Sequence, residues 1–196
     1  QGRMNIWTGQ TSLDAAWASQ DLRRLSAYAA RVPDLTVLGG ALQVKAHAQW
    51  ADYQLKKLSY RGQVRADRLR ARVPMYRLPL ELSTETQFTQ DMIAVHWLDL
   101  SSPGHQLSLQ GQLLHYLRPQ ATQLDAELEI AKLDLAELGA AVAHPAISSF
   151  QALKPSGTLS SKLQLAGLLS DLSVMGDVSI PQARLQNIDI HQGFTR

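Results

Sequence analysis

The chain has 196 residues, of which 45% are hydrophobic and 18% charged, and this composition excludes a disordered chain and suits one domain or part of one. Cysteine is absent, which excludes disulfides, thiolate catalysis and cysteine-ligated metal centres. Lys and Arg outnumber Asp and Glu by 13 to 5 over residues 1–77 and are outnumbered by 6 to 12 over residues 78–196. A basic first half can attract phosphate-bearing partners, but such charges are more often those of solvated strand faces.

No apolar run reaches the roughly 18 residues that a membrane-spanning helix needs, so we expect this segment to be soluble or peripherally bound. The sequence starts at Gln1, without an initiator methionine or an apolar leader. We therefore expect an internal fragment whose targeting or anchoring segment lies outside it.

Apolar and polar residues alternate along most of the chain. Between Leu42 and Trp50 every second residue is apolar, which is typical of a strand with one apolar and one wet face. The same period returns over residues 58–67, 78–88, 93–97, 107–111, 124–130, 159–165 and 172–180. Short punctuating segments separate these strands, so we predict a mainly β fold with about nine to ten antiparallel strands.

Helical spacing interrupts this pattern in two places, first at Leu22 and Leu25 and later at Leu135 and Leu138. The first segment follows Ser19, a candidate N-cap, and ends at Pro33. Pro145 suits the first turn of a further short helix that ends near Leu153. Two or three short helices are too few to cover a sheet of nine strands.

Four landmarks recur in the same order at offsets of about 110 to 117 residues. The segment Thr11–Ala15 (TSLDA) returns as Thr122–Ala126 (TQLDA), and each is followed by a predicted helix. The glycines Gly40 and Gly62 correspond in the same way to Gly157 and Gly176. We predict that residues 1–196 are a single fragment of a repeating fold, with one unit over about 11–121 and a partial unit over about 122–196.

The apolar faces need a cover, which can come from barrel closure, from a sandwich, from a bilayer or from an apolar ligand. Alternation alone does not choose among them. Aromatic side chains are few and the dipeptides Asn-Gly and Asp-Gly are absent, which disfavours a sandwich. The aromatic residues are also irregularly placed, which disfavours an outer-membrane barrel. An open, curved sheet whose leucine-rich concave face holds acyl chains fits the aliphatic bias and the missing covering helices.

Catalysis has little support in the sequence. The six histidines form no metal-binding pair, and nucleophile-elbow, Walker and dinucleotide-binding motifs are absent. Glu127 and Glu129 share a wet strand face with Asp125, so they are best explained as solvated charge. We predict no enzyme activity, no cofactor and no metal site.

Nucleic-acid binding is also disfavoured. Arginines cluster between Arg61 and Arg72, after Lys56 and Lys57, but few aromatic side chains stand beside them for base stacking. The acidic second half of the chain would repel phosphate. The arginines can instead meet lipid head groups or an acidic partner at a groove rim, or keep a strand edge soluble.

The segment Leu153–Leu159 (LKPSGTL) resembles the leucine-x-proline-x-glycine-x-leucine punctuation of the AsmA-like superfamily, and within it most resembles the long YhdP-type proteins, with TamB more distant. The preceding Leu124–Ile130 strand and the Leu133–Leu135 (LDL) helix start are similar to the same family. The strands up to Asp189 also resemble it, and the first repeat copy matches more loosely.

This resemblance implies a repeating, taco-like β-groove with an apolar trough, in a protein anchored in the inner membrane of a Gram-negative envelope and crossing the periplasm. It implies phospholipid movement between the inner and outer membranes, through an anchor outside this fragment and with envelope partners of unknown identity. The alternative is a closed β-sandwich or barrel that serves as a binding or scaffold module in envelope assembly without lipid cargo.

We predict that the apolar strand positions line the groove, with the aromatic side chains among them as wider steps. Leu22, Leu25, Leu135 and Leu138 are expected to face the groove from helices that lie across it or plug it. The predicted lining consists of Leu42, Val44, Ala46, Ala48, Trp50, Leu58, Tyr60, Val64, Leu78, Leu80, Leu82, Phe88, Val95, Trp97, Leu107, Leu109, Leu124, Leu128, Ile130, Leu163, Leu165, Val174, Val178 and Ile180.

Overall fold

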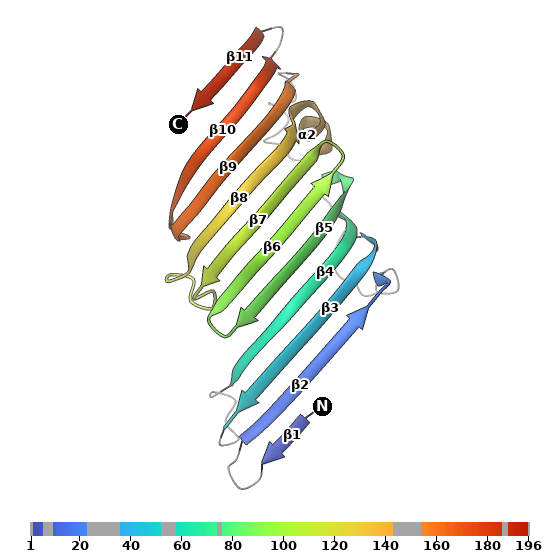
Figure 1. Ribbon diagram of the computed structural model, residues 1–196, viewed down its shortest axis with the longest axis vertical. Coiled ribbons are helices and arrows are strands. Elements are labelled where there is room, and N and C mark those ends of the chain that lie inside the picture. The colour runs from blue at the N-terminus through green and yellow to red at the C-terminus, as the bar shows by residue number, and fades with distance from the viewer. Residues whose placement is uncertain are drawn as a thin grey trace.

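One antiparallel sheet makes up nearly the whole fold (Figure 1). The structure is a computed structural model that describes residues 2–5, 10–22, 36–51, 58–73, 76–142, 154–185 and 188–195. Within these residues, eleven strands lie in the order in which they follow one another along the chain. They are β1 (Gly2–Asn5), β2 (Gln10–Ser19), β3 (Thr36–Trp50), β4 (Ser59–Val73), β5 (Tyr76–Thr89), β6 (Met92–Ser102), β7 (His105–Leu114), β8 (Gln123–Asp134), β9 (Ser156–Leu168), β10 (Asp171–Leu185) and β11 (Ile188–Thr195).

The expected fold class is confirmed, with small differences in the number of elements. Eleven strands replace the nine to ten expected, because edge strands such as the four-residue β1 are too short to show alternation. Residues 78–88 belong to one uninterrupted strand, β5. The described part contains one α-helix, α2 (Leu135–Ala141), in the second predicted helical segment. Residues 23–33 of the predicted helix after Ser19 lie outside the described residues, as does the predicted helix over 145–153.

The start of α2 is determined by Asp134. Its side chain accepts hydrogen bonds of 3.0 Å from the backbone N–H groups of Ala136 and Glu137, which satisfies two donors of the first turn. Ser19, by contrast, ends β2, and its hydroxyl donates to the carbonyl of Asp21 at 3.2 Å.

The sheet is open and carries very little core. Its first and last strands, β1 and β11, pair with β2 and β10 and not with each other, so the sheet does not close. The chain exposes 13519 Å², whereas a compact monomer of this size exposes roughly 9,000 Å². Buried apolar side chains in the described part are limited to Leu22, Ala66, Ala126 and Ala141.

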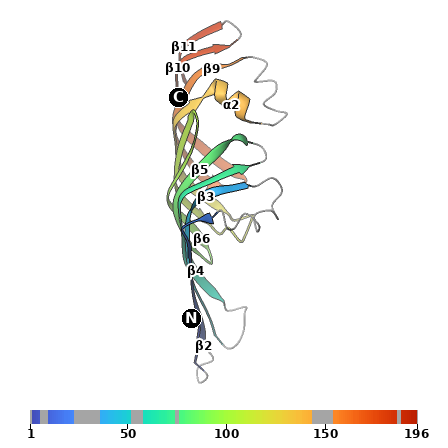
Figure 2. The ribbon, with the colours of Figure 1, turned by 90° about the vertical axis from the view of Figure 1, so that its right-hand side faces the viewer.

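The sheet bends toward one side, where α2 also lies (Figure 2). Register shifts interrupt most strand pairs, for example around Gly39 between β3 and β4 and after Ala66 between β4 and β5. Such bulges add a residue to one strand and increase its local bend and twist. Arg68, at the second of these bulges, has a φ of 47° and donates its backbone N–H to the Ser83 hydroxyl at 3.0 Å.

The repeat landmarks occupy equivalent places in the sheet. Gly40 lies near the start of β3 and Gly157 near the start of β9, and their φ angles are 115° and 120°. Gly62 and Gly176 both lie within the next strand along, β4 and β10. The segments TSLDA and TQLDA begin β2 and β8, so each copy starts with a strand that leads into a long connection.

Candidate functional site

The strand register builds one continuous apolar face. A row of paired residues crosses β6 to β10 through Leu98, Leu109, Leu128, Leu163 and Gly176. Residues that are directly opposite in an antiparallel pair lie on the same face, so every second row repeats this apolar character. The apolar face therefore extends from β2 to β10.

The register places all but three of the predicted lining residues on this apolar face. Leu58 precedes β4, and Leu78 lies in β5 at a position outside the paired register, two residues before Leu80. Most of the set is half-buried, and Val174 is 56% exposed. None of these side chains is enclosed in a packed interior, although their role as a lipid lining remains a prediction.

Trp97 is the third of these residues, and its predicted place on the apolar face is wrong. A register shift between β5 and β6 pairs Val95 with Thr86 but Trp97 with Glu85, so the bulge moves Trp97 to the polar face. There it lines a cavity of about 260 Å³ with residues such as Asp99 and Glu127.

The same bulge explains residues that the alternation missed. Beyond the shift, Leu98 and Leu100 pair with Leu109 and Leu107 on the apolar face, one residue out of phase with the start of the strand. The sequence signal of such a bulge is a change of phase within one strand: the apolar alternation that includes Val95 is followed by one, shifted by one residue, that includes Leu98 and Leu100. Trp17, in β2, also belongs to the apolar face, where it pairs with Val44 and is 43% exposed.

Helix α2 crosses one edge of this face. It contacts β5, β8 and β9, and Val142 at its end forms an antiparallel bridge with Tyr76 in β5. Leu135 and Leu138 are half-buried at this edge, and Leu22 is buried, whereas Leu25 lies outside the described residues. The helix borders the apolar face and leaves its central rows uncovered (Figure 2).

A buried histidine joins α2 to three strands. His105, only 5% exposed, places Nε2 3.1 Å from the carbonyl oxygen of Asp134, the N-cap of α2. Because a carbonyl only accepts, Nε2 carries the proton that is donated to it, and Nδ1 is the ring atom left for other partners. The Tyr76 and Ser102 hydroxyls lie within hydrogen-bond distance of that Nδ1.

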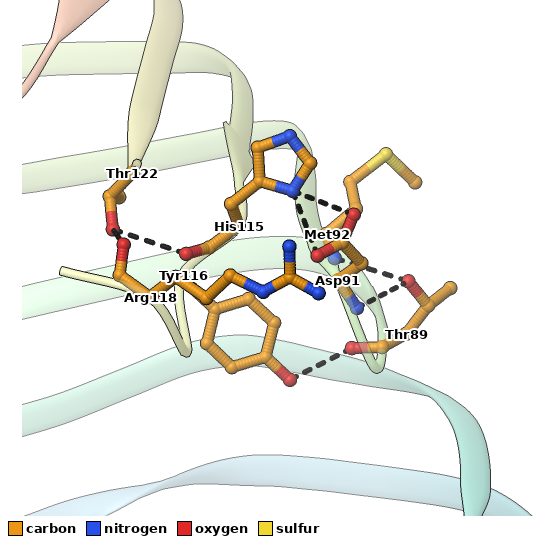
Figure 3. A network of polar contacts seen from close by, with 7 residues as sticks. All are labelled: Thr89, Asp91, Met92, His115, Tyr116, Arg118 and Thr122. Atoms are coloured by element: carbon orange, nitrogen blue, oxygen red, sulfur yellow. Dashed lines mark hydrogen bonds and ion pairs between the residues drawn. The ribbon is translucent and has the colours of Figure 1, made fainter. Parts of the chain in front are cut away.

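A tyrosine crosses the opposite edge (Figure 3). Tyr116, in the connection between β7 and β8, donates its hydroxyl to the Thr89 carbonyl at 2.8 Å. Its oxygen is 2.6 Å from the hydroxyl of Tyr60 in β4, which therefore acts as the donor. The Tyr60 ring lies 6.3 Å from that of Phe88 at a tilt of 51°. These contacts connect β4, β5 and the β7–β8 connection.

Further polar contacts hold this connection in place. His115 Nδ1 lies 2.9 Å from a carboxylate oxygen of Asp91, and the His115 N–H donates to the Asp91 carbonyl at 2.6 Å. The Thr122 hydroxyl reaches the carbonyls of His115 and Arg118 at 3.2 and 3.0 Å. Figure 3 shows that these groups tie the connection to the turn between β5 and β6.

Burial raises the pKa of Tyr116 from 10.0 to about 12, with further contributions from Tyr60 and the Asp91 charge. The fold thus favours the neutral phenol, so its stabilisation is complete below pH 10 and is lost as the pH rises toward 12. We expect wild type to lose roughly 1 kcal/mol more than Tyr116→Phe over this interval, since water screens the half-buried ring. Urea unfolding at several alkaline pH values measures this difference, and parallel curves would contradict it.

The opposite face is polar and divided by charge. Arg61, Arg65 and Arg70 lie there, away from the apolar face, and Lys56 and Lys57 are outside the described residues. Glu85 and Glu81 lie 3.9 and 4.0 Å from Arg65 and Arg70. Acidic residues predominate farther along on β8, namely Asp125, Glu127 and Glu129.

The described residues contain no group of three or more His, Cys, Asp or Glu residues able to hold a metal ion. No helix among them combines the length and apolar character needed to span a membrane.

Comparison with known proteins adds no relative. No family model, curated protein or solved structure matches this chain. The resemblance to the AsmA-like superfamily consequently remains a prediction from the motifs around Leu153–Leu159, and what is established for this chain is its open, antiparallel, mainly β fold.

Proposed function

We propose that this chain is a segment of a lipid-transfer conduit whose apolar face shields phospholipid acyl chains from water. The observation that carries the proposal is an apolar face across β2 to β10 without a second layer over its central rows in the described residues. Large exposed apolar surfaces on soluble proteins mark interaction sites, because water contact with them is unfavourable.

The proposed mechanism is physical and needs no catalytic group. Each buried methylene contributes about 0.8 kcal/mol, so covering most of a sixteen-carbon chain removes a penalty of roughly 10 kcal/mol. Rows of similar aliphatic side chains, such as Leu109, Leu128 and Leu163, offer nearly equal contacts at successive strands. Similar neighbouring contacts let a chain slide, whereas a single deep pocket would hold it.

Place and partners follow from the resemblance alone. In this proposal the segment lies in the periplasm, belongs to a protein anchored in the inner membrane, and passes phospholipid between the inner and outer membranes. A cargo-free scaffold in the envelope is the competing function. Its closed barrel form would require β1 to pair with β11, and the sheet is open.

Lipid extraction from the purified chain, followed by mass spectrometry, tests the proposal. We expect co-purified phospholipid in the wild type and a severalfold loss in Leu128→Asn and in Leu80→Asn, because an amide on the apolar face penalises acyl contact. The matched control is Leu168→Asn, since Leu168 pairs with Gln123 on the polar face and is 37% exposed. Circular dichroism establishes that each variant is folded.

A folded wild type without lipid would refute the proposal. An equal loss in Leu168→Asn would also count against it, because binding would then not depend on the apolar face.

A further inference from the structure

The polar face is hollowed over β2 to β6. A cavity of about 710 Å³ is lined there by residues that include Asp14, Lys45, His47, Arg61, Gln63 and Gln87. The register pairs Asp14 with His47 and His47 with Arg61, and it pairs Lys45 with Gln63 and Gln63 with Gln87. These two neighbouring rows both belong to the polar face. The volume is within the range of small-molecule sites.

Two cations in this cavity differ from the nearby arginines Arg65 and Arg70 of the same face. Lys45 and Arg61 have no hydrogen-bond or ion-pair partner among the described side chains, whereas Arg65 and Arg70 lie beside Glu85 and Glu81. The one carboxylate of the cavity, Asp14, is 2.7 Å from His47 Nδ1. Two cations against one carboxylate leave the cavity positively charged.

The neighbouring amide is already oriented. Gln63 Nε2 donates to Glu85 Oε1 at 2.9 Å, which fixes a polar side chain directly opposite Lys45 and two positions from Arg61 on the same strand. Lys45 and Arg61 occupy diagonal positions on adjacent strands, which places their Cβ atoms about 7 Å apart. Their long side chains can therefore reach one anion together.

We propose that this cavity binds a soluble, phosphate-bearing small molecule. The guanidinium of Arg61 offers two parallel N–H donors to two phosphate oxygens, and the Lys45 ammonium adds a point charge. A phosphate matches the positive charge of Lys45 and Arg61, and the apolar part of the lining, which includes Ala16, Phe88 and Met92, can contact the rest of the ligand. The site lies on the opposite side of the sheet from the apolar face, so it is independent of lipid held there.

The test is calorimetric titration of the folded chain with inorganic pyrophosphate at low salt. We expect saturable binding that weakens about tenfold or more in Arg61→Gln and in Lys45→Gln, as loss of a charge-assisted contact implies. Arg70→Gln is the matched control, since it removes the same charge from the same strand and face outside the cavity. Binding by this control should stay within about twofold of wild type.

Three results would overturn the proposal. The first is the absence of saturable binding by the folded wild type, and the second is equal weakening in Arg70→Gln, which would show an unspecific charge effect. The third is binding to anionic phospholipid vesicles that depends on Arg61 without pyrophosphate binding, because the ligand would then be a membrane surface. Exposed polar side chains are replaced in all variants, and circular dichroism checks their folding.

Discussion

Replacement of Gly111 by valine is expected to lower the free energy of unfolding by roughly 3 kcal/mol. Gly111 has a φ of 151°, which side chains with a Cβ rarely adopt. An added Cβ would lie 2.5 Å from the Cα of Ala126 in β8 and collide with the Asp125 carbonyl oxygen. Strand β7 would have to move from β8 in the middle of the sheet, which urea unfolding followed by tryptophan fluorescence would detect.

Gln106→Val is the matched control for this change. Gln106 lies in the same strand on the polar face, is exposed, and pairs with Lys132 across the strands. Its replacement should change the free energy of unfolding by no more than about 0.5 kcal/mol. Similar values for the two valine variants would show that Gly111 has no special backbone role.

His105→Ala is expected to cost about 2 kcal/mol or more and to loosen α2. The change leaves the Asp134 carbonyl and the Tyr76 hydroxyl without their imidazole partner. It also opens a cavity at a buried position, because His105 is only 5% exposed. Urea unfolding measures the total effect. Amide hydrogen exchange over α2 measures the local one, which should be faster than in the wild type.

His96→Ala provides the comparison. His96 lies in β6, is exposed, and makes no hydrogen bond with another described side chain. We expect a change within about 0.5 kcal/mol and unaltered exchange in α2. If exchange in α2 were unchanged in His105→Ala as well, His105 would not hold the helix to the sheet.

Much of the sheet was predictable because alternation is a local property. A residue such as Leu128 faces the same way as Leu124 since successive side chains of a strand point to opposite sides. The short turn at 103–104 likewise follows from Pro103 and Gly104, whose backbone preferences suit a tight turn. These features depend on neighbours in sequence, so the strands β3 to β10 could be placed approximately.

The face of Trp97 was not predictable in this way. Its alternation with Val95 is regular, yet the bulge opposite Glu85 reverses its side. Pairing with β5 and β7 decides where the extra residue is accommodated, and pairing is a contact between strands. The contacts at the two edges of the apolar face were not predictable for the same reason. They join residues far apart in sequence: His105 and Asp134 are 29 residues apart, and Tyr60 and Tyr116 are 56 apart.

The amino-acid sequence alone determines that the strands are apolar on one side and polar on the other, and that the helices are too few to cover them. That outcome follows from a two-residue period and from turn residues, which act over a few positions. Only the tertiary structure decided that the sheet stays open and bends, that α2 and Tyr116 cross its two edges, and that Lys45 and Arg61 share one hollow. Register shifts and distant hydrogen bonds control these features, because they depend on which strands become neighbours in space.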